Sequence, residues 1–296
     1  MSEWFFLFPG QGSQAPGMGK DFYENSTPAR DALDEAESML GPGFLEILFT
    51  GSADELRDTR VAQTALVSVG VAISRHLMAS GVAPGGVAGH SVGEIAALIT
   101  AGSISFIDGL KLTRERARLM AEEAPPGTMA AVLGLEPAVI AASLPLGVEI
   151  ANFNGPSQTI ISGSLEGIEA AQVMLKEAGA KRVIPLNVSG AFHSPLMALA
   201  AHKLALVIRE TDFKTPAIPF VSSVSGTFET DPERIRELLG RQVSAPVQWT
   251  KVMETIGGKS CLEVAPGNVL QGLAKRMPGG PVVSPAGTLE LASTAV

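Results

Sequence analysis

Residues 85–102 read GGVAGHSVGEIAALITAG, and this stretch decides the fold. Gly85–Gly89 predicts a short strand, and the apolar run Glu94–Ala101 predicts a helix. Between them, residues 89–93 form a Gly-x-Ser-x-Gly pattern. Glycines on both sides let the chain make a strained strand-to-helix turn that exposes the hydroxyl of Ser91. Ser91 is therefore either a nucleophile or the cap of an ordinary glycine-rich helix start.

The elements around this turn predict an α/β fold. Trp4–Phe8 is aromatic, uncharged and followed by Pro9-Gly10, which indicates a buried strand that ends in a turn. Hydrophobic periodicity and turn signals then predict helices over 28–40, 61–80, 104–123, 195–210 and 231–242, a strand over 218–223, and a strand–turn–helix over 261–276.

Residues 125–188 have a different pattern. The order of predicted elements is strand 129–135, helix 137–144, strand 148–153, strand 158–162, helix 165–178 and strand 181–187. This βαββαβ order is that of a ferredoxin-like unit, and we expect it to be inserted into the larger α/β body. The expected domains are a large subdomain (1–124 and 189–276), a small ferredoxin-like subdomain (125–188) and a loosely ordered tail (277–296) rich in Pro, Gly, Ser and Thr.

Composition excludes several classes of protein. The chain has 296 residues, of which 46% are hydrophobic, so wholesale disorder is excluded. Its net charge of −8 argues against a general nucleic-acid or anionic-membrane surface. No window approaches the about 18 uninterrupted apolar residues of a membrane span. A single cysteine, Cys261, excludes an internal disulfide and a cysteine-based zinc cage. We expect a cytoplasmic protein without a metal site.

A serine nucleophile needs a base, and His193 is the best placed of the four histidines. It closes a predicted strand-to-helix loop, with Ser194 as a helix cap and Pro195 at the first helical position. A nearby helix N-terminus disfavours imidazolium, so His193 is expected to stay neutral at pH 7, as a general base must. The alternative is a loop histidine that only bonds to the backbone.

Arg116 lies where an arginine is unexpected. On the helix over 104–123, it projects between Leu112 and Met120, in an otherwise apolar sector. A guanidinium in that place needs an anionic partner, because an isolated buried charge is very costly. The partner is either a carboxylate of the protein, or a carboxylate that the substrate brings; a third reading is a side chain that reaches out to solvent.

With these residues in view, the chain resembles the malonyl-CoA:acyl-carrier-protein transacylase family. The resemblance spans about residues 4 to 276 in family order. Its motifs are FPGQGSQ (8–14), the serine turn, RERARLM (114–120), NFNGPSQ (152–158), FHS (192–194), PVQW (246–249) and EVAPG (263–267). The fold that it implies is a hydrolase-like α/β body with a ferredoxin-like insert.

The resemblance also implies roles for individual residues. Ser91 would accept the acyl group, His193 would be its base, and Arg116 would pair with the malonyl carboxylate. The backbone amides of Gln11 and Val92 would form the oxyanion hole. The backbone carbonyl of Gln248 would orient the histidine.

The residues near the serine and histidine bear on the choice of acyl group. In related acyltransferases, Val after the serine and Ala-Phe before the histidine accompany malonyl rather than methylmalonyl. Val92 and Ala191-Phe192 match this pattern, although Gly190 replaces the more usual polar residue.

The expected activity is transfer of malonyl from malonyl-CoA to the phosphopantetheine thiol of an acyl carrier protein, through a malonyl-serine intermediate and without a cofactor of its own. We expect a monomer, with Lys181-Arg182 and Lys275-Arg276 as local basic contacts for an acidic carrier or as ordinary solvated pairs. Two alternatives are a thioester hydrolase and a non-catalytic module that docks carrier proteins. The absence of a histidine in the last 94 residues counts against a standard α/β-hydrolase order, where this residue lies near the C-terminus.

Overall fold

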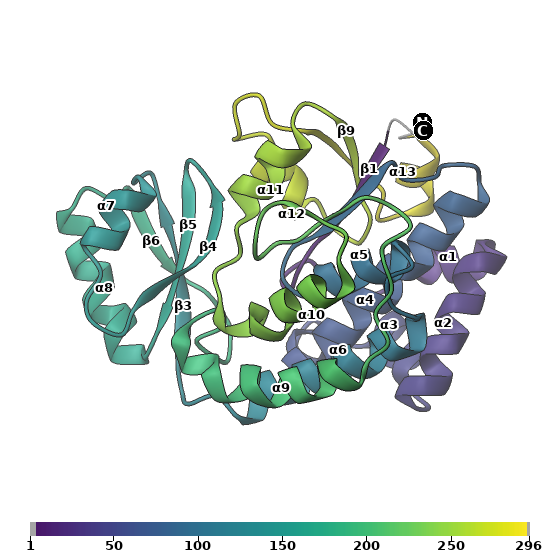
Figure 1. The fold of residues 1–296 in the computed structure, drawn as a ribbon, viewed down its shortest axis with the longest axis horizontal. Coiled ribbons are helices and arrows are strands. Elements are labelled where there is room, and N and C mark those ends of the chain that lie inside the picture. The colour runs from purple at the N-terminus through teal and green to yellow at the C-terminus, as the bar shows by residue number, and fades with distance from the viewer. Residues whose placement is uncertain (1–3, 295–296) are drawn as a thin grey trace.

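The computed structural model describes residues 4–294, which form a large body and a smaller unit beside it (Figure 1). The small unit lies at the left of Figure 1, and the marks for both chain ends lie at the upper right, on the large body. This α/β architecture with two sheets confirms the predicted fold class.

A six-stranded sheet forms the centre of the large body. Its order is β10-β9-β1-β2-β7-β8, and every neighbouring pair is parallel except β7–β8. The strands are β1 (Trp4–Phe8), β2 (Gly86–Gly89), β7 (Phe220–Val221), β8 (Phe228–Glu229), β9 (Ser260–Glu263) and β10 (Val282–Pro285). The order jumps across the sequence, so long crossovers carry helices over both faces of the sheet.

The alternation of side chains along β1 explains why both faces are covered. Phe6 and Phe8 point into the larger core, which α1 to α6, α9 and α10 complete. Phe5 and Leu7 point into a second core against α11 and α12. The helices are α1 (Lys20–Asn25), α2 (Thr27–Leu40), α3 (Phe44–Thr50), α4 (Thr59–Ala79), α5 (Gly93–Thr100), α6 (Phe106–Glu122), α9 (Ala198–Glu210), α10 (Pro232–Arg241), α11 (Trp249–Ile256), α12 (Val269–Ala274) and α13 (Leu289–Thr294). Three short 3-10 turns add η1 (Glu55–Arg57), η2 (Pro195–Met197) and η3 (Gln242–Ser244).

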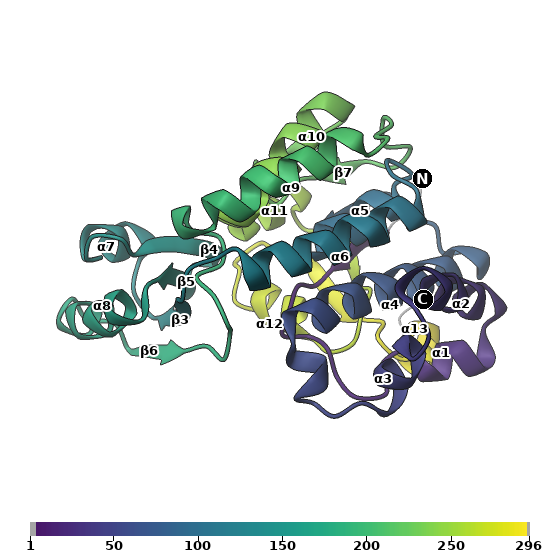
Figure 2. The ribbon, with the colours of Figure 1, turned by 90° about the horizontal axis from the view of Figure 1, so that it is seen from below.

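The small unit has its own antiparallel sheet, in the order β4-β5-β3-β6. Its elements are β3 (Thr128–Leu133), α7 (Pro137–Ala142), β4 (Glu149–Gly155), β5 (Gln158–Gly163), α8 (Leu165–Glu177) and β6 (Arg182–Pro185). The order of elements is βαββαβ, as the sequence predicts. Two helices that pack against each other, α6 and α9, lead into and out of this unit (Figure 2).

The expectation of a loosely ordered tail at 277–296 is wrong for the described part of it. β10 adds a parallel strand to the edge of the main sheet, and the backbone amide of Leu289 donates to the Asp21 carboxylate at 2.6 Å. Val283 is buried in the second core, although the segment around it is rich in Gly and Pro. The last two residues, 295–296, lie outside the described residues.

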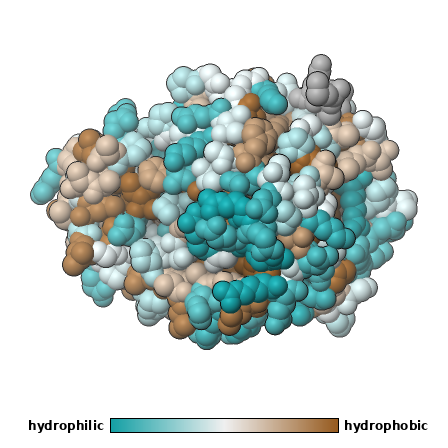
Figure 3. All heavy atoms as spheres, viewed as in Figure 1, coloured by the Kyte–Doolittle hydropathy of each residue, from teal (hydrophilic) through white to brown (hydrophobic). Residues whose placement is uncertain are grey.

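Among the described residues, one helix, α4, is long and apolar enough to cross a membrane. Within residues 4–294, however, 78% of its most apolar window is buried inside the protein, which is typical of a core helix. α4 packs against α2, α5 and α6. Figure 3 shows that exposed apolar surface instead gathers on the small unit, while the charged α10 forms a hydrophilic patch on the large body.

The start of α5 passes very close to the end of β1. A Cβ atom on Gly93 would lie 2.1 Å from the carbonyl oxygen of Phe8, and one on Gly89 would lie 2.1 Å from the carbonyl carbon of Gly93. Real Cβ contacts are not this short, so both positions require glycine.

We therefore expect Gly93→Ala to lower the free energy of unfolding by about 1–3 kcal/mol, the usual cost of an overpacked core. Gly272 in α12 is the matched control, because a Cβ there meets nothing within 4 Å. Gly272→Ala should stabilise the helix by about 0.5–1 kcal/mol. Urea denaturation of the three proteins measures both changes, and equal stabilities would contradict the tight crossing.

Candidate active site

Ser91 occupies the strained turn that the sequence predicts. It follows β2 with φ of 52°, in the left-handed region, and the amide of His90 just before it donates to the Phe8 carbonyl at 2.8 Å. Within residues 4–294, only Ser91 and His193 combine a positive φ with a side chain. Such strain persists only where the surrounding structure enforces it, and it concentrates at functional sites.

The structure brings Ser91 and His193 together from distant parts of the chain. The Ser91 Oγ lies 2.8 Å from His193 Nε2. On the other side of the ring, His193 Nδ1 donates to the backbone carbonyls of Gln242 at 2.9 Å and Ala245 at 3.2 Å. Because Nδ1 carries the proton, Nε2 is left as an acceptor for the serine proton.

The predicted role of Gln248 is wrong. Its backbone amide donates to the Ser223 carbonyl at 2.7 Å, and it caps the start of α11 instead of contacting the histidine. The carbonyls beside His193 belong to Gln242, six residues earlier where α10 passes into η3, and to Ala245. Two glutamines lie close together in this segment, and only the folded path of the chain places one of them against the imidazole.

His193 is held neutral by its surroundings. It is buried, and this burial, together with the nearby Arg116 guanidinium, lowers the pKa of His193 to about 3. The helix start that the sequence predicts after His193 contributes less to this neutral state. The Ser194 hydroxyl donates to the Ala191 carbonyl instead of capping η2. The expected neutral base is therefore present, mainly because of burial.

The other histidine near the site points away from the serine. His90 Nε2 lies 3.0 Å from Asn154 Oδ1, and its ring meets the edge of Trp249. His90 therefore contacts the small unit through Asn154 and the second core through Trp249.

Arg116 lies on α6 with only 1% of its surface exposed. Its Nη2 atom lies 3.1 Å from the Ser91 Oγ, so the guanidinium is aimed at the proposed nucleophile. Burial lowers the pKa of Arg116 to about 10, and the group stays charged at neutral pH.

The other partners of Arg116 are neutral. Nη1 donates to Gln63 Oε1 at 2.6 Å, and Nη2 donates to Gln242 Oε1 at 3.0 Å. No ion pair involves Arg116 within residues 4–294, and its Nε atom finds no acceptor there. A buried cation without an anionic contact is costly, and the open cavity beside it offers a place for a carboxylate from outside.

Two backbone amides are placed where an oxyanion hole would need them. Val92 directly follows the serine and caps α5, and Gln11 follows β1 in the neighbouring loop. Both residues line the cavity at Ser91. Neither backbone N–H has an acceptor among the described residues, so both are available to a ligand oxygen.

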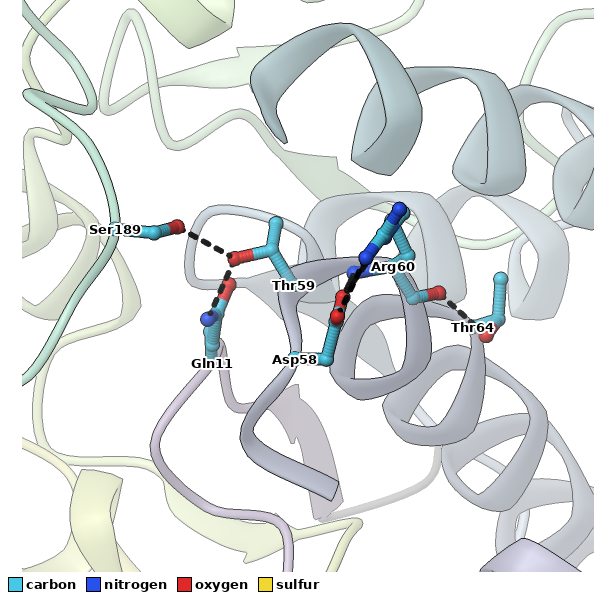
Figure 4. A network of polar contacts seen from close by, with 6 residues as sticks. All are labelled: Gln11, Asp58, Thr59, Arg60, Thr64 and Ser189. Carbon is cyan, nitrogen blue, oxygen red and sulfur yellow. Dashed lines mark hydrogen bonds and ion pairs between the residues drawn. The ribbon is translucent and has the colours of Figure 1, made fainter. Parts of the chain in front are cut away.

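The loop of Gln11 is tied to two other segments (Figure 4). Its side-chain amide donates to Thr59 Oγ1 at 3.2 Å, at the first residue of α4. The Ser189 hydroxyl, on the segment that returns from the small unit, lies 3.5 Å from the same Thr59 oxygen. This bridge connects the proposed oxyanion loop to the start of α4 and to the segment that returns from the small unit.

A cavity of about 180 Å³ opens beside Ser91, His193 and Arg116. Phe192, which is buried, forms part of its apolar wall. Gly190 packs against the ring of Phe192, where a Cβ atom would come within 2.8 Å of the ring. The glycine that departs from the family pattern therefore makes room for the ring.

Three polar residues at this site were not among the predicted ones. Gln63 and Gln242 hold Arg116, and Glu94 accepts a hydrogen bond from the side chain of Gln242. Gln63 and Glu94 lie on apolar faces of α4 and α5, and Gln242 directly follows the apolar face of α10; a polar residue in an apolar stripe is also the signal that indicates Arg116. Within residues 4–294, no group of three or more His, Cys, Asp or Glu side chains could hold a metal ion.

Known proteins are similar to this chain in both sequence and fold. A family profile described as "Acyl transferase domain" matches residues 5–278. The malonyl CoA-acyl carrier protein transacylase of Bacillus subtilis is 40% identical over 94% of this chain and 91% of its own length. The Escherichia coli K12 protein of the same name is 41% identical over 94% of this chain and 93% of its own.

Solved structures agree with these sequence matches. An acyl carrier protein S-malonyltransferase from Vibrio cholerae superposes with a TM-score of 0.95, covers all of both chains and is 37% identical. A malonyl-transacylase solved in complex with its type II PKS acyl-carrier protein gives a TM-score of 0.94 at 37% identity, over 99% of each chain. The strained serine and the neutral histidine agree with these matches, which show that the chain belongs to the malonyl-CoA:acyl-carrier-protein transacylase family of acyl transferases.

Proposed function

We propose that this chain transfers a malonyl group from malonyl-CoA to the phosphopantetheine thiol of an acyl carrier protein. The observation that carries this proposal is the position of Arg116: a buried guanidinium 3.1 Å from the Ser91 hydroxyl, with neutral partners only. The malonyl carboxylate supplies the missing anion. Relatives named malonyl CoA-acyl carrier protein transacylase, and one solved with its carrier protein, support the same donor and acceptor.

The first half of the reaction loads the serine. Ser91 Oγ attacks the thioester carbonyl while His193 Nε2, 2.8 Å away, takes its proton. The backbone amides of Gln11 and Val92 hold the oxyanion, at about 3 kcal/mol per donor in comparable sites. The tetrahedral intermediate collapses, the C–S bond breaks, and the CoA thiolate receives the proton from His193. A malonyl-serine ester and free CoA remain.

The second half repeats these steps with a different thiol. The carrier's phosphopantetheine thiol gives its proton to His193 and attacks the ester carbonyl, and the Ser91 oxygen leaves and regains the proton. One histidine and one oxyanion hole therefore serve both halves, which gives ping-pong kinetics. The proposed reaction uses only protein groups, needs no cofactor and takes place in the cytoplasm.

Arg116 has two effects on the choice of acyl group. A charge-assisted pair with the malonyl carboxylate stabilises bound malonyl by about 1.5–3 kcal/mol. Acetyl would leave a desolvated guanidinium without an anion, and sites built around a buried polar group discriminate by up to about 10⁴-fold. A module that only docks carrier proteins would need neither this clamp nor a neutral base beside the serine.

The basic pairs Lys181-Arg182 and Lys275-Arg276 are proposed contacts for the acidic carrier. All four side chains are exposed, the first pair at the start of β6 and the second at the end of α12. Val269, Leu270 and Leu273 of α12 line the cavity at Ser91, so the second pair follows a helix that reaches this cavity.

Mass spectrometry of the intact protein tests transfer against hydrolysis. After mixing with malonyl-CoA, the protein should gain one malonyl group, and Ser91→Ala should gain none because the acceptor oxygen is missing. A carrier protein with its phosphopantetheine arm should then discharge the adduct within seconds, while buffer alone leaves it in place. Equal discharge by buffer would instead identify a thioester hydrolase.

Arg116→Ala should cut the rate of Ser91 malonylation by about 100-fold or more, and the rate of acetylation far less, because only malonyl loses an ionic partner. Arg118→Ala on the same helix is the matched control, since the Arg118 side chain is 42% exposed and paired with Glu115 and Glu122. Single-turnover acylation with each CoA ester measures both rates. Equal losses on malonyl and acetyl would refute the carboxylate-pairing role.

The acylation rate should stay level from pH 8 down to about pH 5. A base works unprotonated, and His193 with a pKa of about 3 keeps that form throughout this range, whereas a base with the ordinary pKa would be only about 3% active at pH 5. The unfolded chain binds a proton here below about pH 6.5 and the folded chain does not, so stability falls as the pH drops from there. Quenched single-turnover reactions at each pH measure the acylation rate. A fall of this rate on the acid side, centred near pH 6.5, would show that His193 is not held neutral.

A further inference from the structure

Glu94 is a buried carboxylate directly behind the site that the steps above do not use. It lies in the first turn of α5, three residues after Ser91, and is 1% exposed. Its Oε2 atom accepts hydrogen bonds from Ser223 Oγ at 2.5 Å and from Gln242 Nε2. Burial raises the pKa of Glu94, and the hydrogen bonds from Ser223, Ser222 and Gln242 oppose this rise. All of these partners are donors, so they favour the ionised carboxylate.

The side chain of Gln242 connects Glu94 to the site. Its Oε1 atom accepts from Arg116 Nη2 at 3.0 Å, while its Nε2 atom donates to Glu94 and, at 3.2 Å, to the backbone carbonyl of Ser91. Its own backbone carbonyl accepts from His193 Nδ1. One residue therefore contacts the nucleophile's backbone, the base and the cation that is aimed at the substrate.

Glu94 and Arg116, the two charged neighbours of the Gln242 amide, allow only one orientation of this amide. A carboxylate can only accept hydrogen bonds and a guanidinium can only donate them. The Nε2 group of Gln242 must therefore face Glu94, and Oε1 must face Arg116. The opposite orientation would set an oxygen against the carboxylate and an NH₂ group against the guanidinium, two repulsive contacts in a buried site.

Arg116 depends on this orientation. Its Nε atom has no acceptor within residues 4–294, and Gln63 and Gln242 are its main neutral acceptors. If the amide of Gln242 turned, the guanidinium would lose the acceptor that holds Nη2 beside the Ser91 hydroxyl. Glu94 is also the carboxylate whose negative charge favours the protonated form of Arg116 across the amide.

We propose that Glu94 is a positioning residue that fixes the amide of Gln242 and thereby holds Arg116 at the reacting serine. The preference for an acyl group with a free carboxylate then depends on a residue that never touches the substrate. This role presupposes the malonyl transfer proposed above. It adds a specificity-determining residue behind the one that meets the carboxylate.

Glu94→Gln tests this role, because it keeps the size of the side chain and removes its charge. The new amide offers both a donor and an acceptor, so Gln242 is free to adopt either orientation. We expect the single-turnover rate of malonylation to fall by about 10- to 100-fold, the range for loss of a hydrogen bond to a charged group. The rate of acetylation should change by less than about threefold, so the malonyl-to-acetyl ratio falls.

Glu263 provides a matched control. It is also a fully buried glutamate, on β9, and its carboxylate accepts from the backbone amides of Leu270 and Gln271 at the start of α12. Within residues 4–294, Glu263 forms no hydrogen bond or ion pair with Gln242 or Arg116. Glu263→Gln should lower the melting temperature and leave the malonyl-to-acetyl ratio unchanged, because it loosens the fold without touching the amide of Gln242.

A double-mutant cycle separates positioning from general destabilisation. In a Gln242→Ala background, Glu94→Gln should produce no further fall in the malonyl-to-acetyl ratio, because the amide that it orients is gone. If Glu94→Gln does not fold, Glu94→Asp takes its place: the shorter carboxylate stops short of Gln242, and the same ratio should fall by about fivefold or more.

A folded Glu94→Gln protein with an unchanged ratio, or with equal losses on both CoA esters, would overturn this role for Glu94. The same assay on Arg116→Ala keeps the two proposals apart. If Arg116→Ala abolishes the preference for malonyl while Glu94→Gln does not, malonyl transfer stands and the positioning role fails. If Arg116→Ala keeps the preference, the proposed function itself fails.

Discussion

The site depends on one buried cation that has no carboxylate in direct contact with it. Arg116 is buried on α6, is held by the neutral oxygens of Gln63 and Gln242, and has no direct ionic contact within residues 4–294. A protein usually buries a guanidinium only against a carboxylate, because desolvation of the cation is otherwise uncompensated. Leaving this cation with amide partners keeps it in place and still attractive to an incoming anion. Burial, together with this charge, also keeps the neighbouring His193 unprotonated.

The main sheet positions the nucleophile and the two backbone amides that act together with this charge. β1 and β2 are parallel neighbours, so the loops at their carboxyl ends bring Gln11 and Ser91 to one edge. Gly89 and Gly93 let α5 cross the end of β1 at backbone contact distance, which drives Ser91 into its left-handed conformation. The nucleophile, the two amides and the helix start are therefore fixed by backbone packing, and side-chain rearrangement is not needed before reaction.

Much of this architecture could be predicted from the sequence, because it follows local rules. The βαββαβ order of the small unit follows from alternating and helical periodicities. The serine turn follows from glycine spacing, and Arg116 was found as a charge on an apolar helix face. Gln242 obeys the same rule, since it continues the buried stripe of Ile235, Leu238 and Leu239 on α10. A search limited to charged residues passes over it.

What could not be predicted depends on contacts across the fold. Gln248 and Gln242 are equally plausible as backbone partners of a histidine until the path from α10 to α11 is known. The residues after Met277 have a composition typical of loops, yet β9 offers them an open hydrogen-bonding edge on which a strand forms. Short helices such as α1 and α3 have too few turns for a periodic signal, and tertiary packing stabilises them.

The strand at the far end of the chain has a practical meaning for handling this protein. β10 covers the backbone groups of β9 and is itself short, with Pro285 at its last position. Proline cannot donate to a further strand, so the sheet ends in an edge that discourages pairing with other molecules. A shortened version that stops before Val282 would bare β9 instead, and neighbouring copies in a concentrated sample could pair through it and aggregate even with every reacting group intact.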